Sequence, residues 1–161
     1  MSTPDHQRPF TILGHLLLAL VASTSAIAMQ DPAVFTSGDD GYDTFRIPAL
    51  IEAADGTLLA FAEGRVAGRG DSGNIDLVLK RSGDGGTTWG ELEVVWDDGG
   101  NTCGNPCPVL DAVSGRIHLL STHNLGQDHE SEIIAGTSDG TRTVWVLTSD
   151  DHGASWSEPR E

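Results

Sequence analysis

The sequence predicts an all-β fold of meandering antiparallel hairpins, arranged as repeated blades of a β-propeller. Three observations predict it. The 161-residue chain contains 20 glycines, many of them in Asp/Gly-rich turns between short apolar runs. After residue 28, no uninterrupted segment keeps the period of an amphipathic helix. One turn motif occurs twice, which favours a propeller over a sandwich or a barrel.

Eight strand-like runs follow one another along the chain. Turn residues such as Ala54-Asp55-Gly56 and Val113-Ser114-Gly115 separate them, because Gly and Asp adopt the backbone conformations that tight turns require. The expected strands are residues 45–51, 57–63, 75–82, 92–96, 108–110, 116–122, 132–136 and 144–149.

The first 28 residues are expected to be a signal peptide, which leaves residues 29–161 for the folded domain. Residues 12–22 form an apolar run of 11 residues, which is short for a bilayer span. Small residues follow it and end in Ala26-Ile27-Ala28, an A-x-A cleavage pattern. We favour a signal peptide over a membrane anchor, and therefore predict a secreted or periplasmic protein without stable membrane insertion.

The formal net charge of −15 limits the partners. Nucleic acids and anionic membrane surfaces bind basic faces, so both are unfavourable partners for this chain. An anionic ligand would be repelled by the protein as a whole. Binding of such a ligand would have to come from a local cluster of arginines.

The two cysteines, Cys103 and Cys107, are expected to be free thiols. A disulfide is the alternative in an exported protein, but a loop this short that contains Pro106 is difficult to close. A metal site would need further ligands at suitable spacing, and none lie near in the sequence. We therefore expect neither a metal nor a cofactor.

Two arginines and one aspartate mark a candidate site. Arg46 is a permanent cation among apolar neighbours, and its planar fork suits a carboxylate bound bidentately. Pro48 places that segment at a strand start or a sheet edge, since it lacks a ladder donor. Arg65 ends the next strand, and Asp71 follows in a Gly-rich loop. The alternative interpretation is that Arg46 pairs with a nearby Asp.

The repeated turn has the pattern S-x-D-x-G-x-[TS]-W, and its two copies lie 67 residues apart. In such a turn the Asp carboxylate can accept backbone N–H groups, Gly supplies a positive φ, and Trp packs back on the strands. We interpret these residues as structural rather than catalytic. They are Ser82, Asp84, Gly86 and Trp89 in the first copy and Ser149, Asp151, Gly153 and Trp156 in the second.

Together, Phe45-Arg46-Ile47-Pro48, the element Glu63-Gly64-Arg65 with Asp71, and the two Asp-box turns resemble the N-terminal part of an exo-α-sialidase. The resemblance runs from about residue 35 to residue 161. It implies a six-bladed propeller that hydrolyses terminal sialic acids of glycans, glycoproteins or glycolipids. Members of the family bind the sugar carboxylate with three arginines, protonate the leaving group with an Asp and attack with a Tyr.

The resemblance also implies roles for single residues. Arg46 matches the first arginine of the triad, Arg65 an additional arginine near the polar substituents of the sugar, and Asp71 the acid/base. Asn105 and Glu130 would line the pocket for the amide and glycerol groups. For Asn105 a turn-stabilising role beside a proline is an equal alternative, and for Glu130 a solvated loop charge is one.

The family's remaining parts have no match in this sequence. Residues 29–161 supply about two blades and part of a third. The other two triad arginines, the Tyr nucleophile and its Glu partner are unmatched, and Tyr42, the one tyrosine, is not the nucleophile. We therefore expect an incomplete, inactive part of a sialidase. A non-catalytic propeller module that binds an acidic sugar or a protein is the alternative, and transglycosylation or a related acidic sugar also stays open.

Overall fold

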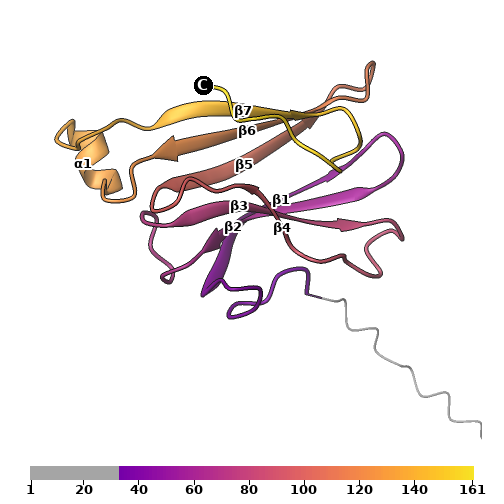
Figure 1. The fold of residues 1–161 in the computed structure, drawn as a ribbon, viewed down its shortest axis with the longest axis horizontal. Coiled ribbons are helices and arrows are strands. Elements are labelled where there is room, and N and C mark those ends of the chain that lie inside the picture. The colour runs from indigo at the N-terminus through magenta and orange to yellow at the C-terminus, as the bar shows by residue number, and fades with distance from the viewer. Residues whose placement is uncertain (1–32) are drawn as a thin grey trace, which may run out of the picture. The chain divides into compact units, whose positions relative to one another are not determined.

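The computed structural model describes residues 33–161, so the expected signal peptide lies outside the described residues. Seven strands and one short helix follow one another along this part of the chain (Figure 1). Their bounds are β1 Thr44–Glu52, β2 Leu58–Arg65, β3 Ile75–Ser82, β4 Glu93–Trp96, β5 Thr102–Leu110, β6 Ile117–Asn124, α1 Glu130–Ala135 and β7 Thr143–Ser149. The expected all-β class is confirmed.

The strands form one open sheet that consists of two antiparallel meanders. In the first, β1 pairs with β2, β2 with β3 and β3 with β4; in the second, β5 pairs with β6 and β6 with β7. A single parallel bridge between Ile75 and Thr102 joins the two meanders. β1 lies at one end of the strand order, as the proline in its sequence predicts.

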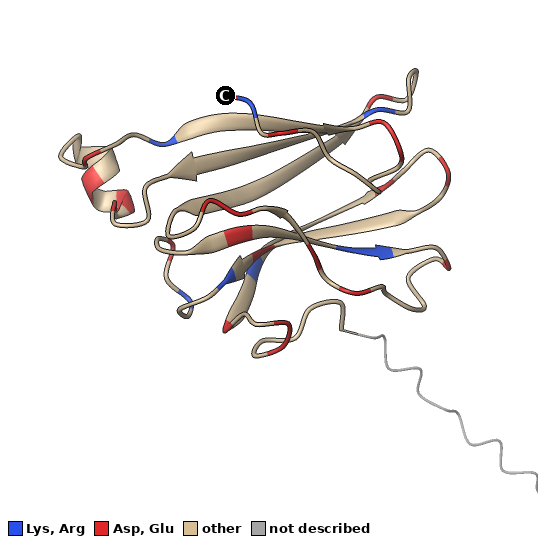
Figure 2. Ribbon diagram, viewed as in Figure 1, with Lys and Arg blue, Asp and Glu red and all other residues tan. Residues whose placement is uncertain are grey.

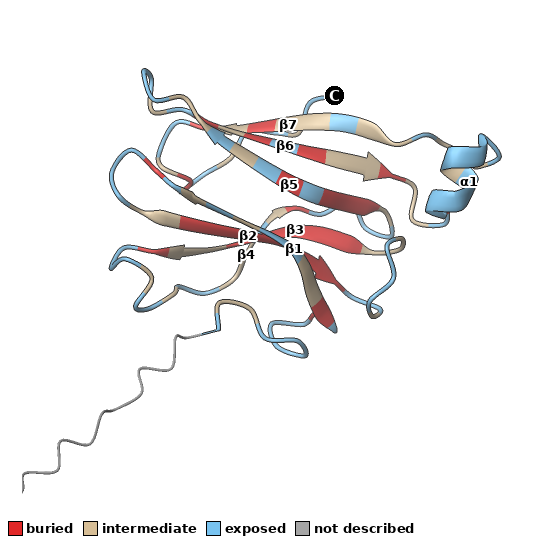
Figure 3. Ribbon diagram, turned by 180° about the vertical axis from the view of Figure 1, so that it is seen from behind, coloured by how far each residue is buried: buried red, intermediate tan, exposed pale blue. Residues whose placement is uncertain are grey.

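The main core lies between these strands, and it buries alternate residues of each. Leu59 and Phe61 of β2, Leu77 of β3, Leu119 of β6 and Leu147 of β7 are fully buried in it. A second, smaller cluster with Tyr42, Ala62 and Val78 covers the other face of β2 and β3. These two strands are therefore buried on both faces, which explains their nearly continuous apolar sequence (Figure 3).

The two copies of the repeated turn have the same hydrogen bonds. Ser82 Oγ donates to Asp84 Oδ1 at 2.8 Å, and the N–H of Thr88 donates to the same carboxylate at 2.9 Å. In the second copy Ser149 Oγ donates to Asp151 Oδ1 at 2.8 Å, and the N–H of Ser155 donates to the same oxygen at 2.9 Å. Both Asp side chains are therefore committed to their own turns.

The tryptophan that ends the second turn, Trp156, packs back onto the core. Its ring meets the ring of Phe61 edge to face, with the centroids 5.7 Å apart. The glycine of this turn, Gly153, has φ +80° and lies against Leu59, so a side chain at this position would meet both backbone strain and core atoms.

A β-bulge with a left-handed residue before a proline occurs in both β1 and β5. In β1 the residue is Ile47, with φ 51°, before Pro48; in β5 it is Asn105, with φ 54°, before Pro106. Asn tolerates this conformation, whereas for a β-branched Ile it is an outlier, of the kind that clusters at functional sites. The bulge also explains why β5 is longer than the expected strand 108–110: it admits the proline within the strand.

The expectation of a strand at residues 132–136 is wrong, because this segment belongs to α1. The first turn of the helix carries Glu130 and Glu132, and acidic side chains there interact favourably with the helix dipole. Gly136 ends the helix in the left-handed conformation, with φ 69°. Ile133 and Ile134 are β-branched residues of the kind common in strands, yet Ile134 is 79% exposed.

The expectation of two free cysteines is confirmed. Both lie on β5, four positions apart along one extended strand, which places their Cα atoms too far apart for a disulfide. The register shift between Gly104 and Cys107 leaves Cys103 buried and Cys107 exposed. Burial raises the pKa of the Cys103 thiol to about 12. The part of the chain that the structure describes contains no helix long and apolar enough to cross a bilayer.

Candidate functional site

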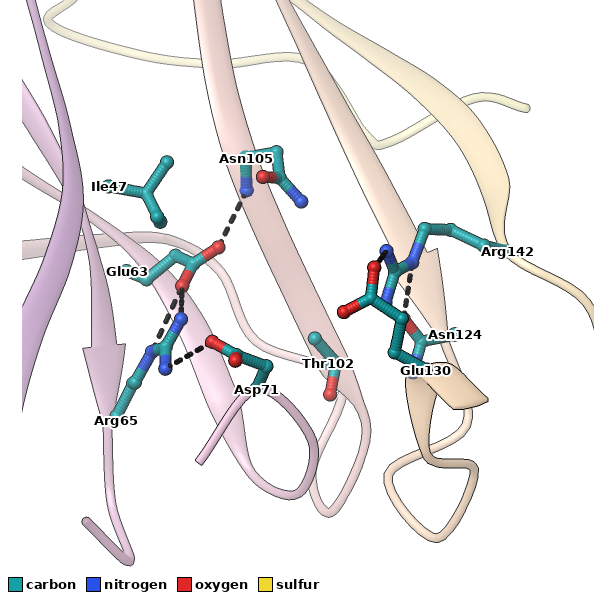
Figure 4. Close-up of a pocket in the computed structure, with 9 residues that line it drawn as sticks. All are labelled: Ile47, Glu63, Arg65, Asp71, Thr102, Asn105, Asn124, Glu130 and Arg142. Carbon is teal, nitrogen blue, oxygen red and sulfur yellow. Dashed lines mark hydrogen bonds and ion pairs between the residues drawn. The ribbon is translucent and has the colours of Figure 1, made fainter. Parts of the chain in front are cut away.

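A polar cavity of about 210 Å³ lies where the bulges of β1 and β5 meet the end of β2. Its far wall comes from α1 and from the residue before β7 (Figure 4). The side chains that line it are Ile47, Glu63, Arg65, Asp71, Thr102, Asn105, Asn124, Glu130 and Arg142. Three of the four residues that we expected to bind substrate, Arg65, Asn105 and Glu130, are among them.

Arg65 is held from behind by Glu63, two positions earlier on the same face of β2. Both side chains are buried, with exposed fractions of 3% and 4%. Arg65 Nε donates to Glu63 Oε2 at 3.0 Å, and its Nη2 donates to the same oxygen. The other oxygen, Oε1, accepts the backbone N–H of Asn105 at 2.9 Å. The buried carboxylate therefore neutralises the guanidinium and also fixes the bulge of β5.

Asp71 lies between two arginines. Its Oδ1 accepts one hydrogen bond from Arg65 Nη1 and one from Arg46 Nη1, each at 2.8 Å. Arg65 Nη1 also donates to the carbonyls of Arg69 and Gly70, at 2.8 and 2.7 Å. The hydrogen bond from Arg65, together with the charges of both arginines, lowers the pKa of Asp71. Without a ligand, Asp71 is therefore ionised at neutral pH.

The loop that carries Asp71 closes at its base, where the N–H of Val66 donates to the carbonyl of Asn74 at 3.2 Å. Gly68 and Gly73 adopt φ values of +111° and +105°, which only glycine reaches without strain. The carboxylate at the tip is 59% exposed. A glycine-rich loop with an exposed tip is expected to be more mobile than the strands that it joins.

Arg46 contacts the site from its rim. Its side chain is 38% exposed, and it borders a neighbouring apolar hollow with Phe35, Phe45 and Pro48 rather than the polar cavity itself. Its Nη1 nevertheless reaches Asp71. The alternative interpretation, in which Arg46 pairs with a nearby Asp, therefore describes the ligand-free arrangement. Acidic residues are spread widely over the loops, and basic residues are few (Figure 2).

Asn105 lies at the bulge of β5, not in a turn, and its Nδ2 donates to Thr122 Oγ1 at 2.8 Å. Glu130 is the first residue of α1, not a loop residue, and its Oε1 lies 3.9 Å from Arg142 Nη1. Both side chains border the cavity, so the structure gives each a fixed place on its wall.

The sequence analysis did not identify Glu63 or Arg142 as site residues. A local pattern in the sequence could have identified Glu63. Glu63 and Arg65 carry opposite charges two positions apart at the end of an apolar strand, so their side chains share one face. The sequence pattern that could have identified Arg142 is weaker: it is a single cation before a strand in a strongly acidic chain. Its Nε donates to Asn124 Oδ1 at 3.1 Å, and its side chain is 30% exposed. Its partners lie 12 and 18 residues away, beyond the reach of a local pattern.

This arrangement can bind a small, polar, anionic molecule. Arg46 is a partly exposed cation at the rim and Arg142 is one on the cavity wall, whereas the buried Arg65 has its charge balanced by Glu63. Asp71 offers a carboxylate at the mouth. Within residues 33–161, no group of three His, Cys, Asp or Glu side chains is placed to hold a metal ion.

Comparison with known proteins places the chain among sialidase-like sequences. The BNR repeat-like domain family matches residues 56–161. An exo-alpha-sialidase of Arthroderma benhamiae is 35% identical over 148 residues, covering 81% of this chain and 36% of the relative. A sialidase of Micromonospora viridifaciens is also 35% identical, over 80% of this chain and 20% of the relative. The chain therefore spans only about a third or less of these relatives.

Solved structures agree with this placement. The Hadza microbial sialidase Hz136 superposes with a TM-score of 0.70 and 26% identity, covering 79% of this chain and 27% of that structure. A leech intramolecular trans-sialidase superposes with a TM-score of 0.66, over 83% of this chain and 37% of that structure. Its identity is only 16%, so this second likeness concerns the fold alone.

Proposed function

Because the chain belongs to the BNR repeat-like domain family and matches the N-terminal part of exo-α-sialidases, we propose that it forms the acid-bearing side of a sialidase active site. The reaction is the hydrolysis of terminal α-linked sialic acids on glycoproteins, glycolipids or other glycans. The protein would meet these substrates as a secreted or periplasmic protein.

One observation carries the proposal: Asp71 accepts hydrogen bonds from Arg46 and Arg65 at the mouth of a polar cavity. A sialic acid carries a carboxylate. In the free protein Arg46 already binds a carboxylate, that of Asp71. The substrate carboxylate would replace Asp71 on Arg46 as a bidentate partner. The residue expected to donate the proton would then be released beside the bound sugar.

This exchange would also prepare Asp71 for acid catalysis. A general acid must be protonated when the glycosidic bond breaks, but the two arginines lower the pKa of Asp71 in the free protein. A substrate carboxylate on Arg46 would neutralise one of these charges, and closure of the site would remove water. Both effects raise the pKa of a carboxylic acid. Asp71 could then give its proton to the leaving oxygen.

The other cavity residues would hold the remaining parts of the sugar. Arg65 lies behind Asp71 and would contact polar substituents, while Asn105 and Glu130 on the opposite walls would contact the amide and glycerol groups. Nucleophilic attack is not assigned to this chain. Tyr42 is the one tyrosine in the sequence, and its hydroxyl is directed to Asp76 at 2.7 Å inside the smaller core cluster.

We also propose that the two meanders are consecutive blades of a six-bladed propeller. β1 to β4 form one four-stranded meander. In the second meander, Arg160 pairs with Val146 of β7 through two backbone hydrogen bonds, of 2.8 and 3.0 Å, in the place of a fourth strand. In each meander the repeated turn follows the third strand. These features are expected of repeated blades.

A binding experiment tests the central assignment. N-acetylneuraminic acid is titrated into the wild-type protein and into Arg46→Ala, and binding is followed by NMR chemical shifts. We expect Arg46→Ala to weaken binding by on the order of 2–4 kcal/mol, and Arg46→Lys to recover only part of it. Arg116→Ala is the matched control, because Arg116 is an exposed arginine paired with Asp150. Equal affinity of wild type and Arg46→Ala would contradict the assignment.

A non-catalytic module that binds an acidic sugar is the second candidate. The lowered pKa of Asp71 in the free protein favours it. Release of sialic acid from an aryl sialoside, measured in a longer protein in which a nucleophile completes this site, separates the two candidates, since a binding module would bind N-acetylneuraminic acid without turnover. The same assay, with lactose present as an acceptor, distinguishes hydrolysis from transfer.

A further inference from the structure

A side-chain hydrogen bond joins the loop that carries Asp71 to the residue that precedes α1. Ser72 Oγ lies 3.1 Å from Nδ1 of His129, a residue 57 positions later in the sequence. Ser72 belongs to the loop of residues 66–74, and His129 immediately precedes α1. The contact therefore connects the glycine-rich loop of the first meander to the helix of the second.

The residues next to this contact are the two exposed carboxylates of the cavity. Asp71 precedes Ser72 and Glu130 follows His129, and both line the cavity on opposite sides (Figure 4). A change in the separation of Ser72 and His129 would therefore change the separation of these carboxylates.

The His129 side of the contact is firmly anchored. The N–H of His129 donates to Glu132 Oε2 at 2.9 Å, which holds the first turn of α1. The carboxylate of the preceding residue, Asp128, is buried and accepts the N–H groups of Asp139 and Gly140, at 3.2 and 2.8 Å. The start of α1 is thus tied to the segment that leads into β7.

The Ser72 side has fewer restraints. Thr102 Oγ1 holds the base of the loop by donating to the carbonyl of Gly73 at 2.9 Å. At the tip, the arginine contacts of Asp71 would be released when a substrate carboxylate binds Arg46. The Ser72–His129 hydrogen bond would remain, because neither residue binds the arginines.

We propose that Ser72 and His129 form a positioning clasp that holds the proposed acid, Asp71, at the mouth of the cavity. The consequence for catalysis rests on the proposed function, but the effect on the loop does not. The clasp keeps Asp71 near Arg65 in the free protein, and it keeps the released carboxyl near the substrate afterwards. The charged groups that face Asp71 are Arg46 of β1, Glu63 and Arg65 of β2, Glu130 of α1 and Arg142 before β7.

Two NMR measurements on the 161-residue chain test the clasp without any ligand. Amide hydrogen exchange of Val66, whose N–H closes the loop on the carbonyl of Asn74, reports the opening of residues 66–74, and the carboxyl ¹³C shift reports the titration of Asp71. Ser72→Ala and His129→Gly should each lower protection of this loop about fivefold, as expected for one lost hydrogen bond. Each should also move the pKa of Asp71 up towards its ordinary value, because the carboxylate spends less time beside Arg65.

Two variants of His129 separate the effect of its hydrogen bond from other effects of changing this residue. Gly is tolerated before a helix, so His129→Gly removes the side chain with little cost to α1. His129→Asn places an amide where Nδ1 lies and should restore both protection and the lowered pKa. The control for Ser72→Ala is Ser114→Ala, since the hydroxyl of Ser114 is also exposed and donates to a carboxylate, that of Asp111.

The double variant decides whether the two residues act as one unit. Ser72→Ala with His129→Gly should lose no more protection than either single change, because both remove the same contact. Additive losses, an unchanged Asp71 titration, or no rescue by His129→Asn would each overturn the clasp. Failure of the wild type to bind N-acetylneuraminic acid would instead overturn the proposed function, while the two NMR measurements would still decide the clasp.

Discussion

Glu63 and Asn105 lie 42 residues apart in the sequence, and the backbone N–H of Asn105 donates to Glu63 Oε1 at 2.9 Å. Because the other oxygen of Glu63 holds Arg65, one buried carboxylate links the arginine of the first meander to the bulge of the second. Gly104 allows this approach, since a Cβ at this position would lie only 2.6 Å from Glu63 Oε1.

Glu63→Gln should strongly destabilise the protein. The change removes the buried counter-charge of Arg65 and leaves it only the exposed carboxylate of Asp71, and breaking a buried ion pair in this way costs about 3–5 kcal/mol. Urea unfolding measures the loss. The matched control is Glu93→Gln, which breaks the exposed pair with Arg81 and should cost at most about 1 kcal/mol. Similar losses for the two variants would contradict the role assigned to Glu63.

Gly64→Ala tests the packing behind the site. A Cβ on Gly64 would lie 2.7–2.9 Å from three ring atoms of Tyr42, which is itself buried and hydrogen-bonded to Asp76. The ring has little freedom to move, so we expect a loss of roughly 1–3 kcal/mol, as for overpacked cores. Thermal unfolding checks it against Gly83→Ala, where nothing lies within 4 Å. Equal melting temperatures for the two variants would refute this account.

Asp71→Asn separates acid catalysis from loop stabilisation, provided that the wild type releases sialic acid. General acid assistance is worth roughly 10²–10⁴-fold and matters least for a leaving group that needs no proton. The variant should therefore be slowed far more on alkyl sialosides than on activated aryl sialosides, and the alkaline limb of its pH profile should flatten. Asp150→Asn, at the exposed pair with Arg116, is the control.

The opposite result would assign Asp71 to structure. If its task were only to hold the loop through Arg65, both classes of sialoside would slow equally through weaker binding, and the alkaline limb would survive. Measured rates for one alkyl and one aryl sialoside are sufficient to decide.

Asp76 should make stability depend on pH in a direction unusual for a carboxylate. Burial raises its pKa to about 6, and its Oδ1 has no hydrogen-bond partner among the described residues. Because the folded pKa lies above the unfolded one, ionisation favours unfolding, and the stability that this group supplies is lost as the pH rises from about 4 to about 6. Asp76→Asn removes the titrating group and leaves Tyr42 an acceptor.

The expected outcome is that Asp76→Asn gains stability relative to wild type between pH 4 and pH 7, by about 3 kcal/mol for a pKa shift of about two units. Urea unfolding at both pH values measures it. Asp111→Asn should show almost no change over this range, because hydrogen bonds from Ser114 and Val113 lower the pKa of Asp111 and its contribution to stability is lost only below about pH 4. A pH-independent difference for Asp76→Asn would show that the pKa of this carboxyl is the same in the folded and the unfolded protein, and would contradict the prediction.

The sequence by itself determined the features that local patterns encode. The apolar runs and Asp/Gly turns place six of the eight expected strands close to where they lie and locate the end of a seventh, β5. The turn motif recurs with the same hydrogen bonds in both copies. Arg46, Arg65 and Asp71 are also visible locally, because an arginine at the end of an apolar strand and an acid in a glycine-rich loop are unusual among their neighbours.

Only the tertiary structure decided which side chains meet. The partners of Asp71, the contact of Glu63 with Asn105, the position of Arg142 on the far wall and the approach of Ser72 to His129 all join segments that are distant in sequence. The same holds for α1. Its two isoleucines are typical of a strand, but the segment is a helix that ends at Gly136 and leaves Ile134 exposed. Periodicity reports which face of a segment is buried, whereas the partner of a polar group is set by how the two meanders pack.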